Sequence, residues 1–262
     1  QWRMTMRGDQ SSSPQLSSVT VSYRQINVPP RIERLVAMSP GEVLVPANFN
    51  PQSQVFEPSH PTKGGIFTTL EASDDEGGGR LKRLWKEGFR TLRWAATDDN
   101  DDTLSYRLEF RRQGDHAGPW SPMAEKLGNT YYSFDATALP DGVYRFRLIA
   151  SDKPDNPDGD ALSASEVSPP VVIDHTPPHL VSVRARGSEL EVVVEDALNP
   201  LRKAEVSFNA GEWKAAEAAD GLLDERKETL IIKVPSTTHL LLLHLMDAAY
   251  NNVTIDLSKD LP

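Results

Sequence analysis

Cysteine is absent from this chain of 262 residues, and aromatic residues make up only 7% of it. Without cysteine the chain has no disulfide, no zinc-thiolate site and no cysteine nucleophile, and its redox compartment stays open because exported domains can also lack cysteine. No apolar run approaches the ~18 residues of a membrane-spanning helix, so we expect no membrane insertion. These absences indicate a chain held together by apolar cores alone.

Positive charge is also scarce. The 28 Lys and Arg residues are outnumbered by 38 Asp and Glu residues, which gives a formal net charge of −10, and no long Lys/Arg cluster occurs. Proteins that bind nucleic acid need a basic patch to neutralise phosphates, so we predict that nucleic acid is not a partner. The 20 prolines outnumber the 16 glycines, a composition that favours many short strands joined by turns over a helical enzyme.

Alternating apolar residues dominate the stretch from Arg90 to Asp174. In Leu92-Arg-Trp94, Tyr106-Arg-Leu-Glu-Phe110 and Tyr144-Arg-Phe-Arg-Leu148, the apolar side chains step by two residues, and Asp, Gly or Pro bounds the runs. This spacing predicts half-buried strands separated by turns. In the last run we expect the aromatic and leucine side chains to face a core and the two arginines to face outward.

A second copy of this pattern follows the first. Ala150-Ser-Asp152 aligns with Leu245-Met-Asp247 without a gap, and Pro29-Pro30 aligns with Pro177-Pro178. A repeat with prolines at its boundaries indicates tandem modules.

The repeat divides the chain into residues 1–27, 28–175 and 176–262. It places the opening strand of the first module at Ile32–Val36, so that residues at about 37–88 become a long and mostly irregular insertion before the second strand. Such a long loop is unusual within a compact domain.

Residues 1–27 have the pattern of a β-hairpin. Met4 and Met6 alternate with polar residues, and so do Val19 and Val21 after a polar turn. A lone hairpin is not stable in water, so we interpret it as the remnant of an upstream domain. The chain begins at Gln1 with neither an initiator methionine nor a signal segment, and we therefore expect it to be part of a longer protein.

Three features resemble the fibronectin type III domain: Trp94 on an early strand, Tyr106 on the next strand, and Leu139-Pro-Asp-Gly-Val-Tyr144. The resemblance implies a tyrosine corner, in which the hydroxyl of Tyr144 fixes a loop to the sheet. The second copy has His239 where this tyrosine would stand, which puts its corner in doubt. The fold that the resemblance implies is all-β, with two tandem fibronectin III/immunoglobulin-like sandwiches.

The same region resembles two groups of exported bacterial proteins. The run from Tyr106 to Tyr144 is similar to the sandwich domain that follows the propeller in periplasmic two-component sensors. Ala150-Ser-Asp152 and Asp174-His-Thr-Pro-Pro178 resemble repeat boundaries in large proteins that carry a β-propeller and immunoglobulin-like arrays. These resemblances imply an extracytoplasmic location, in the periplasm or at the cell surface, and an upstream domain such as a propeller, or another chain, as the partner.

The type III resemblance also implies that acidic turn residues meet. The linker entering a module and two of its loops share one pole, which would gather one set of side chains in each module: Asp174, Asp196, Asp247 and Asn251 in the second, Asp98 and Asp152 in the first. Converging carboxylate and amide oxygens suit Ca²⁺, which takes about six to eight oxygen ligands. A bound calcium would stiffen the junction. The alternative is that these are ordinary turn residues that bond their own backbone.

An enzyme active site is not expected. The six histidines show no metal-ligand spacing, and no Gly-x-Ser-x-Gly elbow is present. The carboxylates lie in hydrophilic turns, where nothing would raise a pKa for acid catalysis.

Two leucines are candidates for an interaction surface. The alternation from His239 to Leu245 places His239 and the odd-numbered leucines in the second core, so Leu240 and Leu242 would stand outside. They are either isolated surface residues or covered, by the insertion or by another chain.

The function that fits these observations best is that of a non-catalytic spacer or protein-interaction module of a larger exported bacterial protein. One alternative is the periplasmic sandwich of a propeller-type sensor. Another is an accessory glycan-binding module that uses Trp85, Trp120 or Trp213 as a stacking platform.

Overall fold

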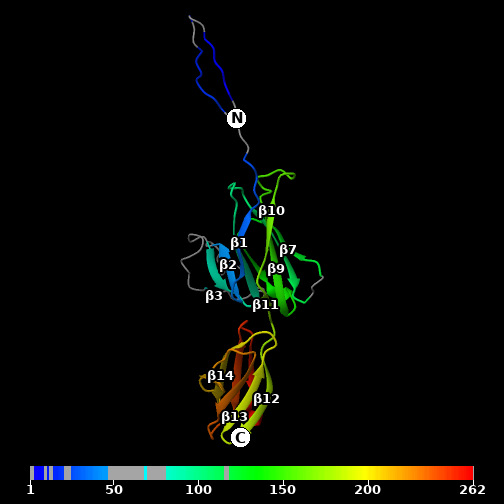
Figure 1. Cartoon of the computed structure of the whole chain (residues 1–262). Helices are drawn as coiled ribbons and strands as arrows, with labels where there is room; N and C mark the ends of the chain where they lie inside the picture. Colours follow the sequence, from blue (N-terminus) through cyan, green and yellow to red (C-terminus); the bar gives the residue numbers. More distant parts are fainter. Residues whose placement is uncertain are drawn as a thin grey trace, which may run out of the picture.

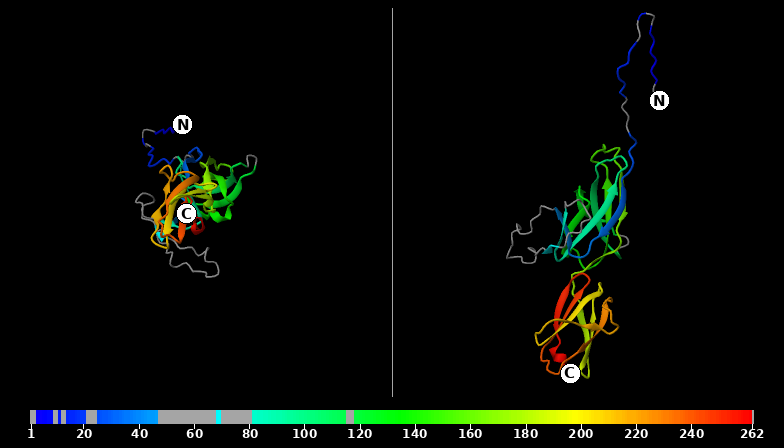
Figure 2. Two further views of the ribbon diagram at one scale, coloured as in Figure 1. Left: turned by 90° about the horizontal axis from the view of Figure 1, so that it is seen from below. Right: turned by 90° about the vertical axis from the view of Figure 1, so that its left-hand side faces the viewer.

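The computed structural model describes residues 3–8, 11, 14–20, 25–46, 68–69, 81–114 and 118–261. The chain is all-β and forms two sandwich modules that stack end to end (Figures 1 and 2). Their helical content in the described residues is limited to short 3-10 turns at Ala136–Ala138 and Ser258–Asp260. Within the same residues, no helix is long and apolar enough to span a membrane.

The first module consists of a three-stranded sheet in the order β1-β5-β8 and a five-stranded sheet in the order β10-β9-β6-β7, with β11 also paired to β9. The strands are β1 (Arg31–Ala37), β5 (Phe89–Thr97), β6 (Ser105–Arg112), β7 (Ser121–Leu127), β8 (Tyr131–Asp135), β9 (Gly142–Ser151), β10 (Ser163–Val167) and β11 (Val171–Ile173). This distribution of strands over two antiparallel sheets is the fibronectin III-like sandwich.

The core of the first module follows the period-two alternation of its strands. Leu108, Phe146 and Leu148 are fully buried from the five-stranded sheet, and the Trp94 ring from the opposite sheet meets the Tyr106 ring edge-on at 5.3 Å between centroids. Inward and outward side chains alternate along β9 as its sequence predicts.

Tyr144 forms the tyrosine corner that the resemblance implies. Its ring lies in the core, and its hydroxyl donates a hydrogen bond to the Pro140 carbonyl at 2.7 Å. The bond connects the turn before β9 to the strand itself. A phenylalanine at position 144 has no hydroxyl and could not donate to the Pro140 carbonyl.

We expect Tyr144→Phe to lower the free energy of unfolding by about 0.5–1.5 kcal/mol, because the ring stays packed while the Pro140 carbonyl loses its donor. Urea unfolding measures the difference. Tyr132→Phe is the matched control: this half-buried side chain stacks on Phe134, and its hydroxyl has no hydrogen bond within the described residues. Equal losses in the two variants would contradict a special role for the corner.

The insertion contains a small sheet of its own, which the sequence did not predict. It has the order β2-β4-β3, from β2 (Glu42–Pro46), β4 (Leu81–Trp85) and β3 (Thr68–Thr69). Val43, Val45 and Leu84 form its core. The insertion is anchored to the first module because the Thr91 hydroxyl donates to the Glu42 carbonyl at 2.7 Å. Residues 47–67 and 70–80 lie outside the described residues.

The second module repeats the sandwich with sheets in the orders β12-β13-β17-β16 and β15-β14-β18-β19. Its strands are β12 (His179–Arg186), β13 (Glu189–Glu195), β14 (Leu201–Phe208), β15 (Lys214–Ala215), β16 (Glu217–Ala218), β17 (Lys227–Lys233), β18 (Leu241–Asp247) and β19 (Asn252–Asp256). Leu241, Leu243 and Leu245 are fully buried in its core, as the alternation predicts.

The prediction that His239 faces this core is wrong. The strand β18 begins only at Leu241, and His239 is exposed in the preceding turn. Its backbone N–H donates to Asn209 Oδ1 at 2.9 Å. The Asn209 side chain thus organises this turn from β14, and no corner residue is needed there.

The expected amino-terminal hairpin is not formed as paired strands. Residues 3–8 and 14–20 carry no strand, are exposed, and extend away from the first module (Figure 1). Residues 21–23 of the second expected strand lie outside the described residues. Met4 and Val19 have no core to pack against, and an isolated hairpin gains too little burial to pair stably.

Candidate functional site

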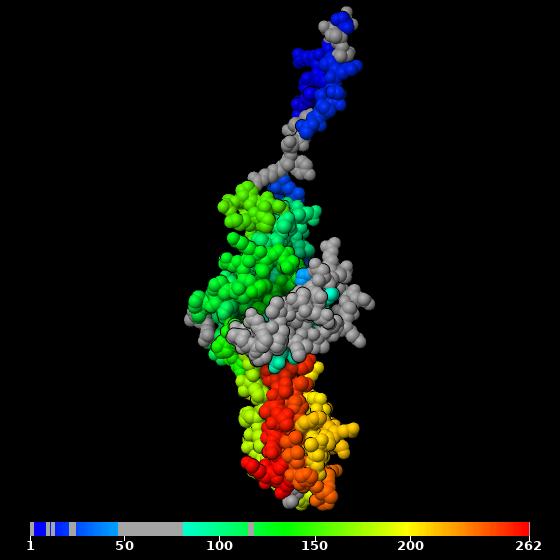
Figure 3. All heavy atoms as spheres, turned by 180° about the vertical axis from the view of Figure 1, so that it is seen from behind, coloured from blue at the N-terminus to red at the C-terminus, as the bar shows by residue number. Residues whose placement is uncertain are grey.

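Three aspartates meet where the linker enters the second module. Asp174 follows β11, Asp196 follows β13, and Asp247 ends β18. One carboxylate oxygen from each lies within 4.8 Å of the others, and all three residues are buried. In the space-filling view, the red strands of the second module reach the lower end of the first module (Figure 3). This junction cluster, Asp174, Asp196 and Asp247, therefore belongs to the contact between the modules.

Asparagine side chains connect the junction cluster. The Asn199 amide donates to Asp174 Oδ2 at 2.5 Å. The Asn251 amide donates to Asp247 Oδ2 at 2.8 Å and to the Asp174 carbonyl at 3.1 Å, so the linker is held to the turn after β18. Asn251 was predicted to join the aspartates, whereas no sequence pattern pointed to Asn199.

The aspartates also bond their own turns, as the alternative reading expects. Asp196 Oδ1 accepts the backbone N–H groups of Leu198 and Asn199 at 2.9 and 2.7 Å, and Asp174 Oδ1 accepts that of Thr176 at 3.1 Å. Asp196 Oδ2 accepts no hydrogen bond from the described part of the chain. Turn stabilisation thus uses one oxygen of Asp196 and leaves the other for a further partner.

Burial and mutual repulsion raise the pKa values of Asp174 and Asp247. Burial raises the pKa of Asp247 to about 6, and the charges of Asp174 and Asp196 add to the rise against the hydrogen bonds from Asn251. Burial likewise raises the pKa of Asp174. The sequence pattern predicts no raised pKa among the turn carboxylates, and that prediction is wrong for Asp174 and Asp247, which are buried at the junction.

Arg90 is a basic residue that interacts electrostatically with two members of the junction cluster, Asp174 and Asp247. Burial lowers the pKa of its guanidinium to about 10, while the attraction of Asp174 and Asp247 opposes the fall, so the side chain stays charged at neutral pH. Its N–H groups donate to the carbonyls of Val172 at 2.6 Å and Met38 at 3.3 Å. One guanidinium does not balance three carboxylates, so the junction keeps an excess of negative charge.

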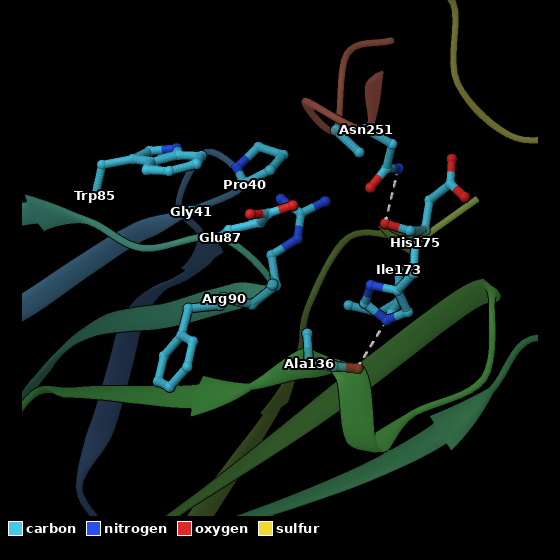
Figure 4. A pocket seen from close by; sticks show the side chains of 13 residues that line it. Pro40, Gly41, Trp85, Glu87, Arg90, Ala136, Ile173, His175 and Asn251 are labelled. Atoms are coloured by element: carbon cyan, nitrogen blue, oxygen red, sulfur yellow. Dashed lines mark hydrogen bonds between the residues drawn. The ribbon is translucent and has the colours of Figure 1, made fainter. Parts of the chain in front are cut away.

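A small pocket opens beside the junction cluster. Figure 4 shows it between the insertion, with Pro40 and Trp85, and the linker, with His175. The Nε2–H group of His175 donates to the Ala136 carbonyl at 3.0 Å. Its volume of about 30 Å³ exceeds the ~10–15 Å³ that one water requires and is far below the ~300 Å³ of a small-molecule site. This pocket therefore has room for a water molecule or a small ion and not for an organic substrate.

The insertion contacts the second module at the junction through Trp85. The Trp85 ring meets the Tyr250 ring of the second module edge-on at 6.2 Å, and the Arg202 guanidinium lies 4.7 Å from the Tyr250 centroid. Gly41 has φ +78° and lies against Trp85, whose indole nitrogen is 2.1 Å from the position of a Cβ. A side chain at Gly41 would displace Trp85 from this contact.

The opposite pole of the first module carries a matching group. Asp98, Asp102 and Asp152 have carboxylate oxygens within 4.8 Å of one another. The linker residue Asn27 reaches this group, because its amide donates to Asp152 Oδ2 at 2.7 Å. The buried atoms Asp98 Oδ2 and Asn27 Oδ1 have no hydrogen-bond partner among the described residues. We call Asn27, Asp98, Asp102 and Asp152 the entrance cluster.

The donor atoms of both clusters suit a hard divalent cation. Each combines carboxylates from a linker or loops with nearby amide groups, and neither metal-competent group contains a histidine. Oxygen-only donor sets favour Ca²⁺ or Mg²⁺ over zinc or copper, and irregular geometry from flexible loops favours Ca²⁺. A positive charge would give the oxygens of the entrance cluster that lack a hydrogen-bond donor a partner, and it would offset the repulsion that raises the pKa of Asp247 at the junction.

Leu240 and Leu242 are half-buried at the outer face of the β15-β14-β18-β19 sheet. Leu242 stands between Ser207 on β14 and Asp256 on β19. Neither leucine is among the strongly exposed apolar residues of the described chain.

The tryptophans proposed as glycan platforms have different surroundings. Trp85 is part of the junction, and Trp120 lies beneath the guanidinium groups of Arg111 and Arg147. Only Trp213 among these three is strongly exposed, at 44%, and its ring packs near His244 at 5.7 Å.

No protein-family model matches this chain, and no curated protein is significantly similar to it. Among solved structures, the chain is similar to the FN1-FN3 domains of chicken CNTN1, with 12% identity over 88% of this chain and 98% of that chain. The TM-score of 0.26 is too low for this likeness to bear on function. The functional conclusion therefore rests on the geometry of the chain itself.

Proposed function

We propose that this chain is a non-catalytic spacer and protein-interaction unit of a larger exported bacterial protein, stiffened by calcium at its module junction. The observation that carries this proposal is the junction cluster, in which a linker aspartate and two loop aspartates converge between the modules. A spacer acts by holding its neighbours at a fixed distance and angle, and a cation bound to both linker and loops would fix that angle.

The electrostatics supply a reason for the cation. Buried carboxylates that are close together carry an unfavourable desolvation and repulsion energy unless a positive charge compensates them. Arg90 supplies one positive charge, and its N–H groups are engaged by backbone carbonyls. A divalent ion would complete the neutralisation and bind the linker to the second module.

The entrance cluster supports the same role at the other end. Asn27 stands shortly before Pro29-Pro30 much as Asp174 stands before Pro177-Pro178, so both modules receive their linker beside a group of carboxylates. An upstream domain, such as the propeller that the boundary motifs imply, would be fixed to the first module there. The extracytoplasmic location is part of this proposal, because free calcium reaches millimolar levels outside cells.

Thermal unfolding of the whole chain in 1 mM Ca²⁺ and in chelator tests the proposal. A site with a Kd of about 10 µM would add about 2.7 kcal/mol to the stability of the second module, and this gain should vanish in Asp196→Asn/Asp247→Asn. Asp220→Asn/Asp224→Asn is the matched control, since both residues are exposed in the same module and the charge change is identical.

Small-angle scattering of the same samples distinguishes stiffening from simple binding. Calcium should narrow the distribution of overall chain dimensions in the parent chain and in the control variant, and leave the junction variant unchanged. A stabilisation equal in all three chains, or none, would refute a junction site. Stabilisation without a change in the dimensions would refute the stiffening role.

A further inference from the structure

The outer face of the five-stranded sheet in the first module is rich in arginine. Beside residues such as Val143 and Ile149, the positions that point away from the core on β6 and β9 carry four arginines and one glutamate: Arg107, Glu109, Arg111, Arg145 and Arg147. The chain as a whole has a net charge of −10. A local excess of positive charge on an acidic protein requires a specific explanation.

Glu109 neutralises part of this positive charge. It stands opposite Arg147 in the register, and the Arg147 Nε donates to Glu109 Oε2 at 2.7 Å with a second, closer contact from Nη2. Arg107 Nη2 lies 3.4 Å from the other oxygen, Oε1. This buried carboxylate therefore forms ion pairs with two of the four arginines.

Arg111 and Arg145 are left facing each other. They are direct partners in the pairing of β6 with β9, and neither forms an ion pair within the described residues. Like charges directly opposite on a sheet are unfavourable. Arg145 donates to the Ser168 carbonyl at 3.1 Å, and a neutral carbonyl does not balance its charge.

Trp120 orients Arg111 and Arg147. The guanidinium carbons of Arg111 and Arg147 lie 4.8 and 4.6 Å from its ring centroid. Stacking on an aromatic ring orients an arginine without using its hydrogen-bond donors. Val167, which is 39% exposed, adds an apolar group opposite Arg147 on the neighbouring β10.

We propose that this face is a docking surface for an acidic segment of a partner protein, with Arg111 and Arg145 binding its carboxylates. The bound Glu109 shows that a carboxylate fits between guanidinium groups on this face. Tryptophan, arginine and a bordering apolar side chain are the residue types that carry binding energy at protein interfaces. They favour a protein partner over a sulfated polysaccharide. This surface is distinct from both acidic clusters.

Fluorescence anisotropy with a labelled peptide that alternates glutamate with serine and leucine tests this docking surface in the full chain at low salt. Arg111→Gln/Arg145→Gln should weaken binding at least tenfold, because both unpaired guanidinium groups are removed. Arg184→Gln/Lys233→Gln should leave the affinity within twofold, since these exposed second-module residues give the same change in net charge. Arg111→Lys/Arg145→Lys keeps the charge but cannot form the bidentate hydrogen bonds of a guanidinium with a carboxylate, so an intermediate affinity is expected.

The melting temperature of Arg111→Gln/Arg145→Gln should be unchanged or higher, because a like-charge pair is removed. This measurement separates loss of binding from loss of fold. A heparin-type polysaccharide that binds through the same arginines while the peptide does not would overturn the assignment to a protein partner. Binding of neither probe, or equal binding by the Gln variant and the parent chain, would overturn the docking surface itself.

Discussion

Replacing Phe146 with alanine is expected to lower the free energy of unfolding of the first module by about 3–5 kcal/mol. Phe146 is fully buried on β9, the central strand of the five-stranded sheet. Its ring lies 5.7 Å from that of Phe134 on β8 in the facing sheet, so it joins the two layers of the sandwich. Removing the ring leaves a cavity that both sheets would have to collapse to fill.

Urea unfolding of the full chain measures this loss. Leu222→Ala is the matched control, because Leu222 is a large apolar residue that is 62% exposed in the second module, and its truncation should change stability by no more than about 0.5 kcal/mol. Phe146→Ala should leave the unfolding of the second module in place, since none of the core residues of that module contacts Phe146. A loss below about 1 kcal/mol would show that Phe146 does not join the sheets as the structure indicates.

Asp247→Asn is expected to act in opposite directions with and without calcium. Burial raises the folded-state pKa of Asp247 to about 6, above the ~3.9 of an unfolded aspartate. A group whose folded pKa is raised contributes stability that is fully present below the unfolded pKa and is lost as the pH rises through the folded pKa. At pH 7.5 in chelator, the ionised carboxylate therefore destabilises the second module, and the neutral asparagine should raise its melting temperature.

The advantage of asparagine should shrink between pH 7.5 and pH 4, because Asp247 becomes neutral as well. In 1 mM Ca²⁺ at pH 7.5 the order should reverse, with the parent chain more stable, since the ion needs the carboxylate. Melting curves at pH 4, 5 and 7.5, each with chelator or calcium, measure both effects, and Asp220→Asn serves as the exposed control. An Asp247→Asn chain that is less stable than the parent at pH 7.5 in chelator would contradict the unfavourable burial of this carboxylate.

Much of the fold could be predicted from local patterns. The alternation in β6, β9 and β18 identifies the residues that face each core, because side chains in a strand point to opposite faces in turn. The Leu139-to-Tyr144 motif predicts the tyrosine corner, since that bond spans only a few residues. The resemblance to the type III domain, in which the linker and two loops share one pole, implies which carboxylates meet at the junction. The strand and corner inferences use residues that are near in sequence, and the junction inference uses the family pattern.

Features that depend on distant pairing could not be predicted in this way. The insertion sheet joins β2 to β4 across a long connection, and no local pattern specifies that register. His239 lies outside the core because Asn209 organises its turn from another strand. Three further pairs come from segments that are distant in sequence and could not be predicted either: Arg111 opposite Arg145, Arg90 beside Asp174, and Asn27 beside Asp152.

Sequence patterns were sufficient to predict that this chain is all-β, which faces of its strands are buried, and which acidic residues were candidates for a cation site. Three features became visible only in the packed structure: the linker covers three aspartates, Trp85 of the insertion contacts the second module, and two arginines face each other with no ion-pair partner among the described residues. The physical reason is that alternation along a strand fixes only the direction of each side chain. Burial, pKa and unpaired charge depend on what the rest of the chain places against that side chain.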